Sequence, residues 1–321
     1  MTAGPDVSVI IPAWNAEAFI HRAIETALAQ TGIACELIIV DDASSDETGA
    51  AVKAAAGGDE RVRFERLDEN SGPAAARNKA LELASGRYIA VLDADDTMAP
   101  SRLHDLVKLA DETGVDIVAD NMRQVIFPST VPEDAPFLTL PDTPGPTEIS
   151  LAVYMDPDTD MKFGGGLGYL KPLFRRGALE RLDARYDETL RNSEDYYFVA
   201  KILAAGGRML ISPDAGYHYT VRTGSISHRL TPDLTSAILH AETEFMDVFA
   251  GKFDEAERKA ARRRGKRLRN VDTFVRFVAA LKKKQPIAAT GIVASQPASM
   301  PHVLSELFRI AGEKSGKRLK A

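Results

Sequence analysis

The nine residues Tyr88-Ile89-Ala90-Val91-Leu92-Asp93-Ala94-Asp95-Asp96 carry both a fold signal and a site signal. The apolar, partly β-branched run at 88–92 predicts a buried strand. Three carboxylates follow within four positions, where burial is costly unless a cation or a polar ligand meets them. Because ligands of open α/β sheets bind at the carboxyl ends of the strands, the stretch predicts a divalent metal that carries an anionic substrate. Acidic residues also cap helices and end strands, so the choice between a binding site and a structural role depends on the rest of the sequence.

Strands and helices alternate on both sides of this stretch. Nearly continuous apolar runs predict buried parallel strands, and apolar residues at helical spacing predict helices between them. The predicted strands are 7–12, 36–40, 62–65, 88–92 and 115–121, and the predicted helices are 20–28, 46–56, 73–84 and 100–112. Such alternation indicates βαβ units and therefore an α/β fold with a mostly parallel sheet.

The alternation stops at 128–168, a segment with seven prolines and the triplet Gly164-Gly165-Gly166. A loop of this length inside a compact domain is usually functional or disordered. Regular structure is expected to resume at 169–175 and in a helix at 195–205. From 232 onward the pattern is helical.

Composition predicts a cytoplasmic protein. The single cysteine, Cys35, excludes a disulfide framework and a cysteine-rich zinc site and fits a reducing compartment. No signal peptide is expected at the N-terminus, and no apolar run approaches the length of a membrane span. The net charge of −6 is unevenly distributed, because residues 251–284 carry 13 Lys and Arg against 4 Asp and Glu.

Further polar groups follow the other predicted strands. Asn15 follows the first strand, Asp41 and Asp42 end the second, and Arg77 lies on the helix after the third. All are expected at the C-terminal edge of one sheet, so they should converge in space. Asn15 and Asp46 also suit helix caps, Arg77 suits either phosphate binding or a solvated helix face, and one of Asp41 and Asp42 is expected to face a ligand.

With these motifs in view, the chain resembles the family 2 glycosyltransferases of GT-A fold, which are inverting enzymes that use nucleotide-diphosphate sugars and a divalent metal. Four motifs in order carry the resemblance over residues 7–125, and a second block extends it to 227. The first four are VSVIIPAWN (7–15), IVDDASSD (39–46), NSG with ARN (70–72 and 76–78) and LDADD (92–96). The second block comprises KPLFRR (171–176), NSEDYYF (192–198), YHY (217–219), Arg222 and SIS (225–227).

The resemblance implies a role for each matched position. Asp42 would accept a hydrogen bond from the nucleotide base, most often uracil, while Pro12, Asn15 and Arg77 would line the nucleotide pocket. Asp93, beside Ala94, would contact the ribose, Asp95 would bind Mn²⁺ or Mg²⁺, and Arg222 would contact the diphosphate. Asp195 would be the catalytic base, with Glu194 as the alternative. His218 is a further candidate metal or phosphate ligand, and a structural role fits it equally well.

The chemistry agrees with these roles. A hard cation held by carboxylates neutralises the charge that develops on a diphosphate leaving group. A carboxylate near the acceptor hydroxyl removes its proton as a general base. We therefore predict an inverting transferase that moves a sugar, most often from a UDP-sugar, to a glycan or lipid-linked saccharide acceptor of bacterial exopolysaccharide assembly. The alternative is a catalytically inactive GT-A-like protein that binds a nucleotide sugar or serves as a scaffold.

On this reading the catalytic domain spans 1–231, with a nucleotide-binding half (1–125) and an acceptor-binding half (126–231). Residues 232–321 form a helical extension. Within it, 257–284 is predicted as one long helix with a basic first half and an apolar stripe. The stripe comprises Val271, Phe274, Val275, Val278 and Leu281. One expectation is that the stripe packs on the catalytic domain or on a second subunit. The other is that the basic half of the helix binds the anionic inner face of the plasma membrane. Nucleic acid is not an expected partner, because nothing else in this acidic chain supports it.

Overall fold

The computed structural model describes residues 4–141, 145–222 and 230–318, with side chains as far as 310. Two compact units divide the chain at 225/226, and each is described by itself. The predicted division at 231/232 stays a prediction. The motif at 225–227 lies outside the described residues.

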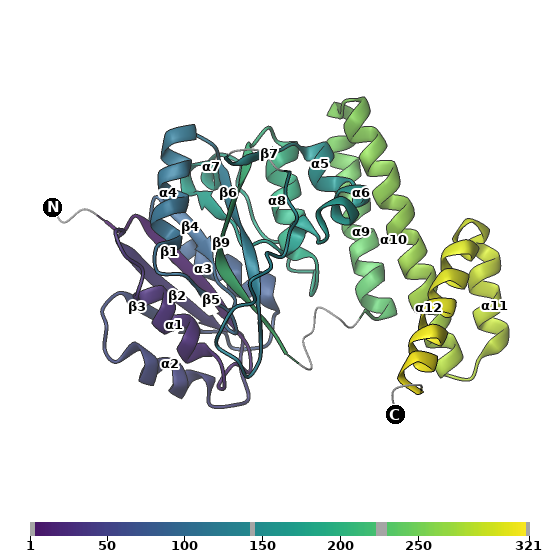
Figure 1. Cartoon of the computed structure of the whole chain (residues 1–321), viewed down its shortest axis with the longest axis horizontal. Helices are drawn as coiled ribbons and strands as arrows, with labels where there is room; N and C mark the ends of the chain where they lie inside the picture. Colours follow the sequence, from purple (N-terminus) through teal and green to yellow (C-terminus); the bar gives the residue numbers. More distant parts are fainter. Residues whose placement is uncertain (1–3, 142–144, 223–229, 319–321) are drawn as a thin grey trace. The chain divides into compact units, whose positions relative to one another are not determined.

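Four parallel strands form one half of the sheet in the first unit (Figure 1). They are β1 (Val7–Ala13), β2 (Cys35–Asp41), β3 (Val62–Arg66) and β4 (Tyr88–Val91). Their order is β3-β2-β1-β4, and Ile10 of β1 is paired with Ile38 of β2 and with Val91 of β4. Strands β2, β1 and β4 are almost wholly buried, which explains their continuous apolar runs. The expected α/β fold with βαβ units is confirmed here.

Helices connect these strands as the sequence predicts. They are α1 (Ile20–Leu28), α2 (Thr48–Ala56), α3 (Pro73–Leu83) and α4 (Arg102–Thr113). Helix α1 buries Ile20, Ala23, Ile24 and Ala27, the face that its apolar spacing marks. Gly72 precedes α3 with φ +95°, a conformation that favours glycine and lets Pro73 occupy the first turn.

The other half of the sheet is mixed. Its strands are β5 (Thr97–Met98), β6 (Ile117–Ile126), β7 (Thr147–Ile149), β8 (Leu173–Arg175) and β9 (Met209–Val221). The order continues β4-β8-β6-β9-β5, with β8 antiparallel to both neighbours, β6 parallel to β9, and β7 also on β9. Strand β9 was not predicted. Its middle contains Pro213 and Gly216, and its register against β6 shifts there, so it resembles two short segments in sequence.

The proline-rich segment is more regular than the sequence suggests. It contains β7, α5 (Leu151–Met155), α6 (Pro157–Phe163) and a 3₁₀ turn at Leu167–Tyr169. Ser150 and Asp156 cap the two short helices, accepting hydrogen bonds from Val153 N and Asp158 N. Beyond β8 lie α7 (Arg176–Arg181) and α8 (Glu194–Ala204), the latter close to the predicted helix at 195–205.

The second unit is helical in its described part. It comprises α9 (Pro232–Phe249), α10 (Glu255–Lys282), α11 (Pro286–Ser295) and α12 (Met300–Arg318), with α9 alongside α10 (Figure 1). A capping box of Asp254 and Glu257 starts α10. The predicted stripe is half-buried at its first four positions, and the Phe274 ring lies 6.2 Å from that of His302 on α12. Phe274 therefore contacts another helix of its own unit.

None of the helices in the described residues combines the length and apolar character required to cross a membrane.

Candidate functional site

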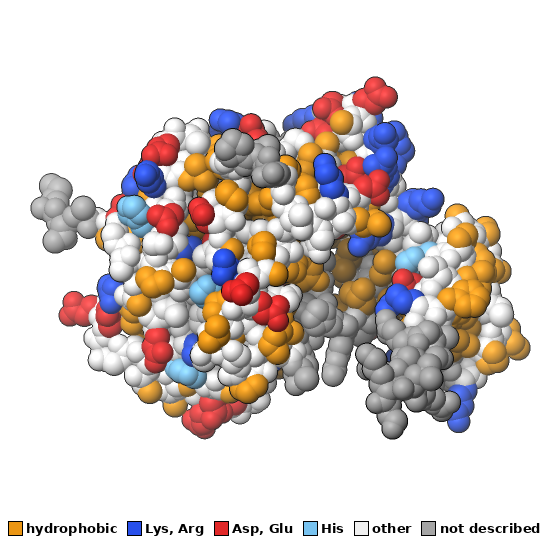
Figure 2. All heavy atoms as spheres, in the orientation of Figure 1, with side chains coloured by type: hydrophobic (Ala, Val, Ile, Leu, Met, Phe, Trp, Pro, Cys, Tyr) orange, Lys and Arg blue, Asp and Glu red, His pale blue; other side chains and the backbone are white. Residues whose placement is uncertain are grey.

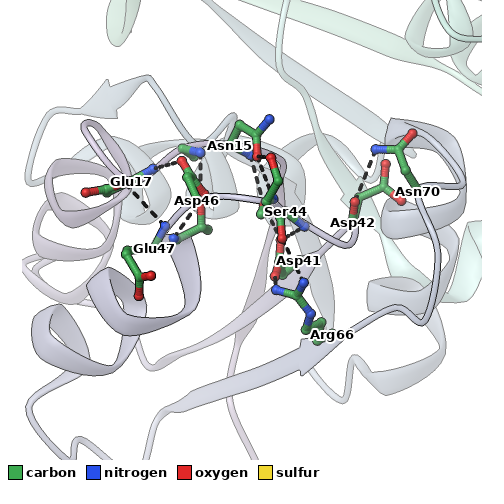
Figure 3. Close-up of polar contacts among 12 residues, drawn as sticks. Asn15, Glu17, Asp41, Asp42, Ser44, Asp46, Glu47, Arg66 and Asn70 are labelled. Carbon is green, nitrogen blue, oxygen red and sulfur yellow. Dashed lines mark hydrogen bonds and ion pairs between the residues drawn. The ribbon is translucent and has the colours of Figure 1, made fainter.

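Asp41, the last residue of β2, and Asp42, which follows it, have different environments (Figure 3). Asp41 is fully buried, with Oδ2 2.5 Å from Arg66 Nη1 and Oδ1 accepting from the Ser44 hydroxyl. Asp42 accepts from two backbone N–H groups, Ser71 N at 2.7 Å and Gly72 N at 2.8 Å. Asp41 thus stabilises the loop after β2. Each oxygen of Asp42 retains acceptor capacity, because a carboxylate offers about four lone-pair sites.

Asn15 joins the loop after β1 to the loop after β2 (Figure 3). Its backbone N–H donates to Ser44 Oγ at 2.9 Å, and its Oδ1 accepts from Ser45 N at 2.9 Å. The residue has φ +47°, a left-handed conformation that asparagine tolerates better than most residues. It bridges two loops and caps no helix. Pro12 lies in β1 opposite Val40, and the carbonyl oxygen of the next residue, Ala13, accepts a hydrogen bond from Asp42 N at 2.8 Å.

The three carboxylates after β4 are used in three ways. Asp96 is buried, and its two oxygens accept from the Tyr217 hydroxyl at 2.6 Å and from Thr220 N at 2.7 Å. Burial, together with the neighbouring Asp95 and Asp93, raises its pKa well above the usual value. Asp95 accepts from Arg222 Nε at 2.7 Å. Asp93 contacts Arg77 on α3 and Lys171 before β8, and Ala94, between Asp93 and Asp95 in the sequence, is buried.

Arg77 is the centre of a buried cluster that the sequence did not predict. Its guanidinium lies 2.7 Å from Glu194, 2.9 Å from Asp93 and 3.5 Å from Asp195, and its side chain is 4% exposed. Helix α3, the end of β4 and the start of α8 meet here. Arg77 is therefore a counter-ion for three carboxylates in this structure, and the expected place in a nucleotide pocket stays a prediction.

Lys171 supplies the second cation of the cluster. Its Nζ lies 2.9 Å from Asp93 Oδ2 and 2.7 Å from Asp195 Oδ2. Burial alone would raise the pKa of Asp93, but Lys171 and Arg77 outweigh it and lower that pKa to about 2. The KPLFRR motif was part of the resemblance, yet no role was assigned to its lysine. The sequence signal was a charged residue two positions before the strand β8.

Glu194 and Asp195 differ although they are adjacent at the start of α8. Glu194 is the more buried, and burial raises its pKa despite the attraction of Arg77. Asp195 shares its Oδ2 between Lys171 and Arg77, while its Oδ1 accepts no hydrogen bond from the described part of the chain. Asp195 therefore has an oxygen available for a substrate proton, which makes it the better candidate base of the two.

His218 follows Tyr217 on β9. Because side chains alternate along a strand, it lies on the other face from Tyr217, whose hydroxyl reaches Asp96. Its Nδ1 lies 3.4 Å from Thr97 Oγ1, and burial together with nearby Arg123 lowers its pKa. That His218 binds a metal ion or a phosphate stays a prediction.

The donor set fits a metal that the substrate helps to hold. Among the described residues, no group of three His, Cys, Asp or Glu side chains could hold a metal ion. Asp93 contacts two cations and Asp96 accepts two hydrogen bonds, whereas Asp95 contacts Arg222 through Oδ2; Asp95 is therefore the candidate ligand among the three, and its binding of a metal stays a prediction. Mg²⁺ is commonly bound by one or two carboxylates plus substrate phosphates, and this arrangement suits that mode.

Comparison with known proteins agrees with the resemblance seen in the sequence. The sequence profile of glycosyl transferase family 2 matches residues 8–163. The succinoglycan biosynthesis protein ExoO of Rhizobium meliloti (strain 1021) is 38% identical over 302 residues, which cover 93% of this chain and 84% of ExoO. ExoU of the same strain is 34% identical and covers 97% of this chain and 91% of ExoU.

Solved structures share the fold. S. aureus TarS 1-349 in complex with UDP-GlcNAc has a TM-score of 0.60 at 20% identity, covering 91% of this chain and 92% of that one. The mannosyltransferase PcManGT from Pyrobaculum calidifontis, in complex with GDP-Man and Mn²⁺, has a TM-score of 0.60 at 20% identity, with coverages of 96% and 81%. The expected GT-A fold with a helical C-terminal region is confirmed.

Proposed function

The chain belongs to glycosyl transferase family 2, and from that premise we propose that it transfers a sugar from a nucleotide-diphosphate sugar to a saccharide or lipid-linked saccharide acceptor. Exopolysaccharide assembly is the proposed setting, because the relatives ExoO and ExoU are named for succinoglycan biosynthesis. The observation that carries the proposal is the convergence of Asp93 and Asp195. They are 102 positions apart in sequence, yet both bind Lys171 and Arg77.

The donor is proposed to bind along the C-terminal edge of β1, β2 and β4. Asp42 would accept from the base, Pro12 and Asn15 would line the pocket, and Asp93 and Ala94 would lie beside the ribose. A UDP-sugar is the favoured donor, in line with the TarS complexes with UDP-GlcNAc and UDP. PcManGT binds GDP-Man, so the base is the part of the donor that most needs testing.

A divalent ion, Mn²⁺ or Mg²⁺, is proposed to be held by Asp95 and the donor diphosphate. When bound, the ion would act as a Lewis acid that stabilises negative charge on the leaving group. Arg222 would place a second positive charge at the same position, because its guanidinium forms an ion pair with Asp95. The guanidinium carbon also lies 4.8 Å from the centroid of the Phe19 ring, a cation–π contact that holds the side chain there. A role for His218 at the metal is the less favoured part of this proposal.

Asp195 is proposed as the general base of an inverting displacement, with Glu194 as the alternative. The acceptor hydroxyl gives its proton to Asp195 as its oxygen bonds to the anomeric carbon. The bond from that carbon to the diphosphate breaks at the same time, and its electron pair leaves with the nucleoside diphosphate. No protein nucleophile is needed. An inactive binding or scaffold protein is not favoured, because each proposed carboxylate is present.

Contact with an anionic membrane surface, or a homodimer, is proposed through the second unit, which would place a cytoplasmic protein at the inner face of the plasma membrane. Lys and Arg side chains lie along α10 and hydrophobic side chains over α11 (Figure 2). Exposed basic residues on α10 include Arg258, Arg262, Lys266 and Arg269, while Ile287 on α11 is 87% exposed. The polar and apolar parts of such a surface would suit headgroups and acyl chains respectively.

A thermal-shift panel tests the donor proposal. UDP-, GDP- and dTDP-sugars are compared with and without Mn²⁺, since a ligand at about 100 times its Kd stabilises a folded protein by about 2.7 kcal/mol. A rise in Tm with UDP-sugars that requires Mn²⁺ is the expected result. If no nucleotide sugar of the panel raises Tm, with or without Mn²⁺, the proposed function is wrong.

A further inference from the structure

Lys171 contacts two carboxylates that have different roles in the proposed reaction. Its Nζ contacts Oδ2 of Asp93, proposed for the donor side, and Oδ2 of Asp195, proposed for the acceptor side. The side chain is 9% exposed, so this ion pair is poorly screened by solvent. Arg77 contacts the other oxygen of Asp93 and also approaches Asp195 Oδ2.

We propose that Lys171 is a positioning residue for the transfer reaction, which holds Asp195 by one oxygen so that the other faces the acceptor hydroxyl. The inference rests on the proposed function and deepens it. Because two cations share Oδ2, the orientation of the carboxylate plane is fixed, and Oδ1 is the oxygen left to receive a proton. By contacting Asp93 as well, the same ammonium group fixes the base relative to the donor side of the site.

The backbone of Lys171 is anchored, which makes a long flexible side chain suitable for this task. Its carbonyl oxygen accepts from Arg102 Nη2 at 2.6 Å. Arg102 is buried and held by Asp120 through Nε and Nη2, with the shortest contact at 2.7 Å. A buried, bidentate ion pair has one strongly preferred geometry. The hydrogen bond from Arg102 thus fixes the main chain of Lys171. Its ammonium group is held by the carboxylates of Asp93 and Asp195.

Charge explains why a lysine occupies this position. Asp195 is faced by Arg77 from α3, by Lys171, by Asp93 after β4, by its neighbour Glu194, and by Tyr186 before α8. Without Lys171, one guanidinium would have to balance three carboxylates. Repulsion among them would push the carboxylates apart, and Asp195 would lose the orientation that the acceptor hydroxyl needs. Lys171 therefore balances the charge of the cluster and keeps the proposed base oriented.

The test compares Lys171→Met, which removes the charge and keeps the length, with Lys171→Arg. Lys79→Met, on the exposed side of α3, is the matched control. The ¹³C carboxylate signal of Asp195 is recorded in each protein and assigned by its loss in Asp195→Asn. The signal should move and broaden in Lys171→Met, because Oδ2 of Asp195 has lost its nearest cation, and it should not change in Lys79→Met. Lys171→Arg should restore most of the parental signal.

The kinetic arm measures UDP release from the UDP-sugar that the thermal-shift panel identifies, with UDP affinity measured by calorimetry. The kcat should fall in Lys171→Met by more than the UDP affinity does, and Lys171→Arg should recover most of the lost rate. An unchanged carboxylate signal or an unchanged kcat in Lys171→Met overturns the inference. A parent protein that releases no UDP contradicts the proposed function instead, and the carboxylate signal still decides whether Lys171 positions Asp195. If Lys171→Met does not fold, Lys171→Gln is measured in its place with the same two criteria.

Discussion

Arg222, the residue after β9, forms an ion pair with Asp95 in the segment after β4, with 2.7 Å between Nε and Oδ2. The two residues are 127 positions apart, and the pair brings the proposed diphosphate contact to the proposed metal ligand. A divalent ion and Arg222 would both neutralise Asp95, so the donor diphosphate would meet two positive charges at one place. This relationship makes Asp95 the most direct point at which to test metal dependence.

Asp95→Asn is expected to abolish the part of UDP affinity that depends on Mn²⁺ while the fold is retained. The physical reason is that an amide is a much weaker ligand for a hard cation than a carboxylate. Calorimetric titration of UDP with and without Mn²⁺ measures it. Asp116→Asn, at a carboxylate near the opposite end of the sheet, serves as the control. Equal Mn²⁺-dependent affinity in Asp95→Asn and the parent would rule out Asp95 as a ligand.

Asp93→Asn should lower stability by an amount that depends on pH. Since Lys171 and Arg77 lower the pKa of Asp93 from 3.8 to about 2 in the folded protein, its ionised form stabilises the fold above pH 4. That contribution, about 2 kcal/mol, is lost as pH falls through about 2. Urea unfolding at pH 7, 5 and 3.5 should show a constant difference between variant and parent at the first two values and a smaller one at the third. A difference that grows on acidification would contradict the assignment of these ion pairs.

Asp120→Asn should destabilise the first unit strongly, by about 3–5 kcal/mol, because it leaves the buried charge of Arg102 without its partner. Chemical denaturation of the full chain measures the change. Glu65→Gln is a suitable comparison, since Glu65 pairs with Arg63 at a largely exposed position and such pairs contribute about 0–1 kcal/mol. Similar effects of the two substitutions would mean that the Arg102 pair is not a buried anchor.

The second unit offers a test between a membrane and a second subunit. Arg262, Lys266 and Arg269 are exposed on α10, so changing all three to Glu should abolish pelleting with anionic vesicles, and salt should weaken pelleting of the parent. Lys53, Arg63 and Lys108, exposed in the first unit, are changed to Glu as the control.

The dimer arm of that test uses the exposed apolar residues Ile287 and Phe308. If the parent ignores vesicles and behaves as a dimer in light scattering, changing both to Asp should produce a monomer. Phe274, a residue of the predicted stripe, is unsuitable because it packs within its own unit. Pelleting that is indifferent to salt and lipid charge would contradict the membrane proposal.

Much of the fold was predictable because local patterns decide it. The apolar runs of β1, β2 and β4 and the spacing in α1 have the periods of buried strands and an amphipathic helix. Strand β9 was missed because Pro213 and Gly216 interrupt it. Helices α5 and α6 were missed because prolines suggested a loop, although Ser150 and the Asp156-Pro157 pair are recognisable helix starts.

The sequence predicted the site only as a set of residues at one edge of the sheet. Which of these residues form ion pairs with one another depends on contacts between distant segments, and no local sequence pattern contains that information. Arg77 could be read as a phosphate ligand or a solvated residue, and only the position of α8 shows that it is a buried counter-ion. Lys171 lay within a matched motif, but its partners Asp93 and Asp195 are 78 and 24 positions away. Tyr217 and Thr220, which hold Asp96, lie on the strand that was not predicted.

The most direct test of the account is UDP release from a UDP-sugar by the parent, Asp195→Asn and Glu194→Gln, each with its UDP affinity measured by calorimetry. Loss of a general base costs about 10²–10⁴-fold in rate. We predict a loss of that size in Asp195→Asn with UDP affinity unchanged, and a smaller loss in Glu194→Gln. Release at the parental rate by both variants, with UDP still bound, would contradict the central claim that this carboxylate pair activates the acceptor.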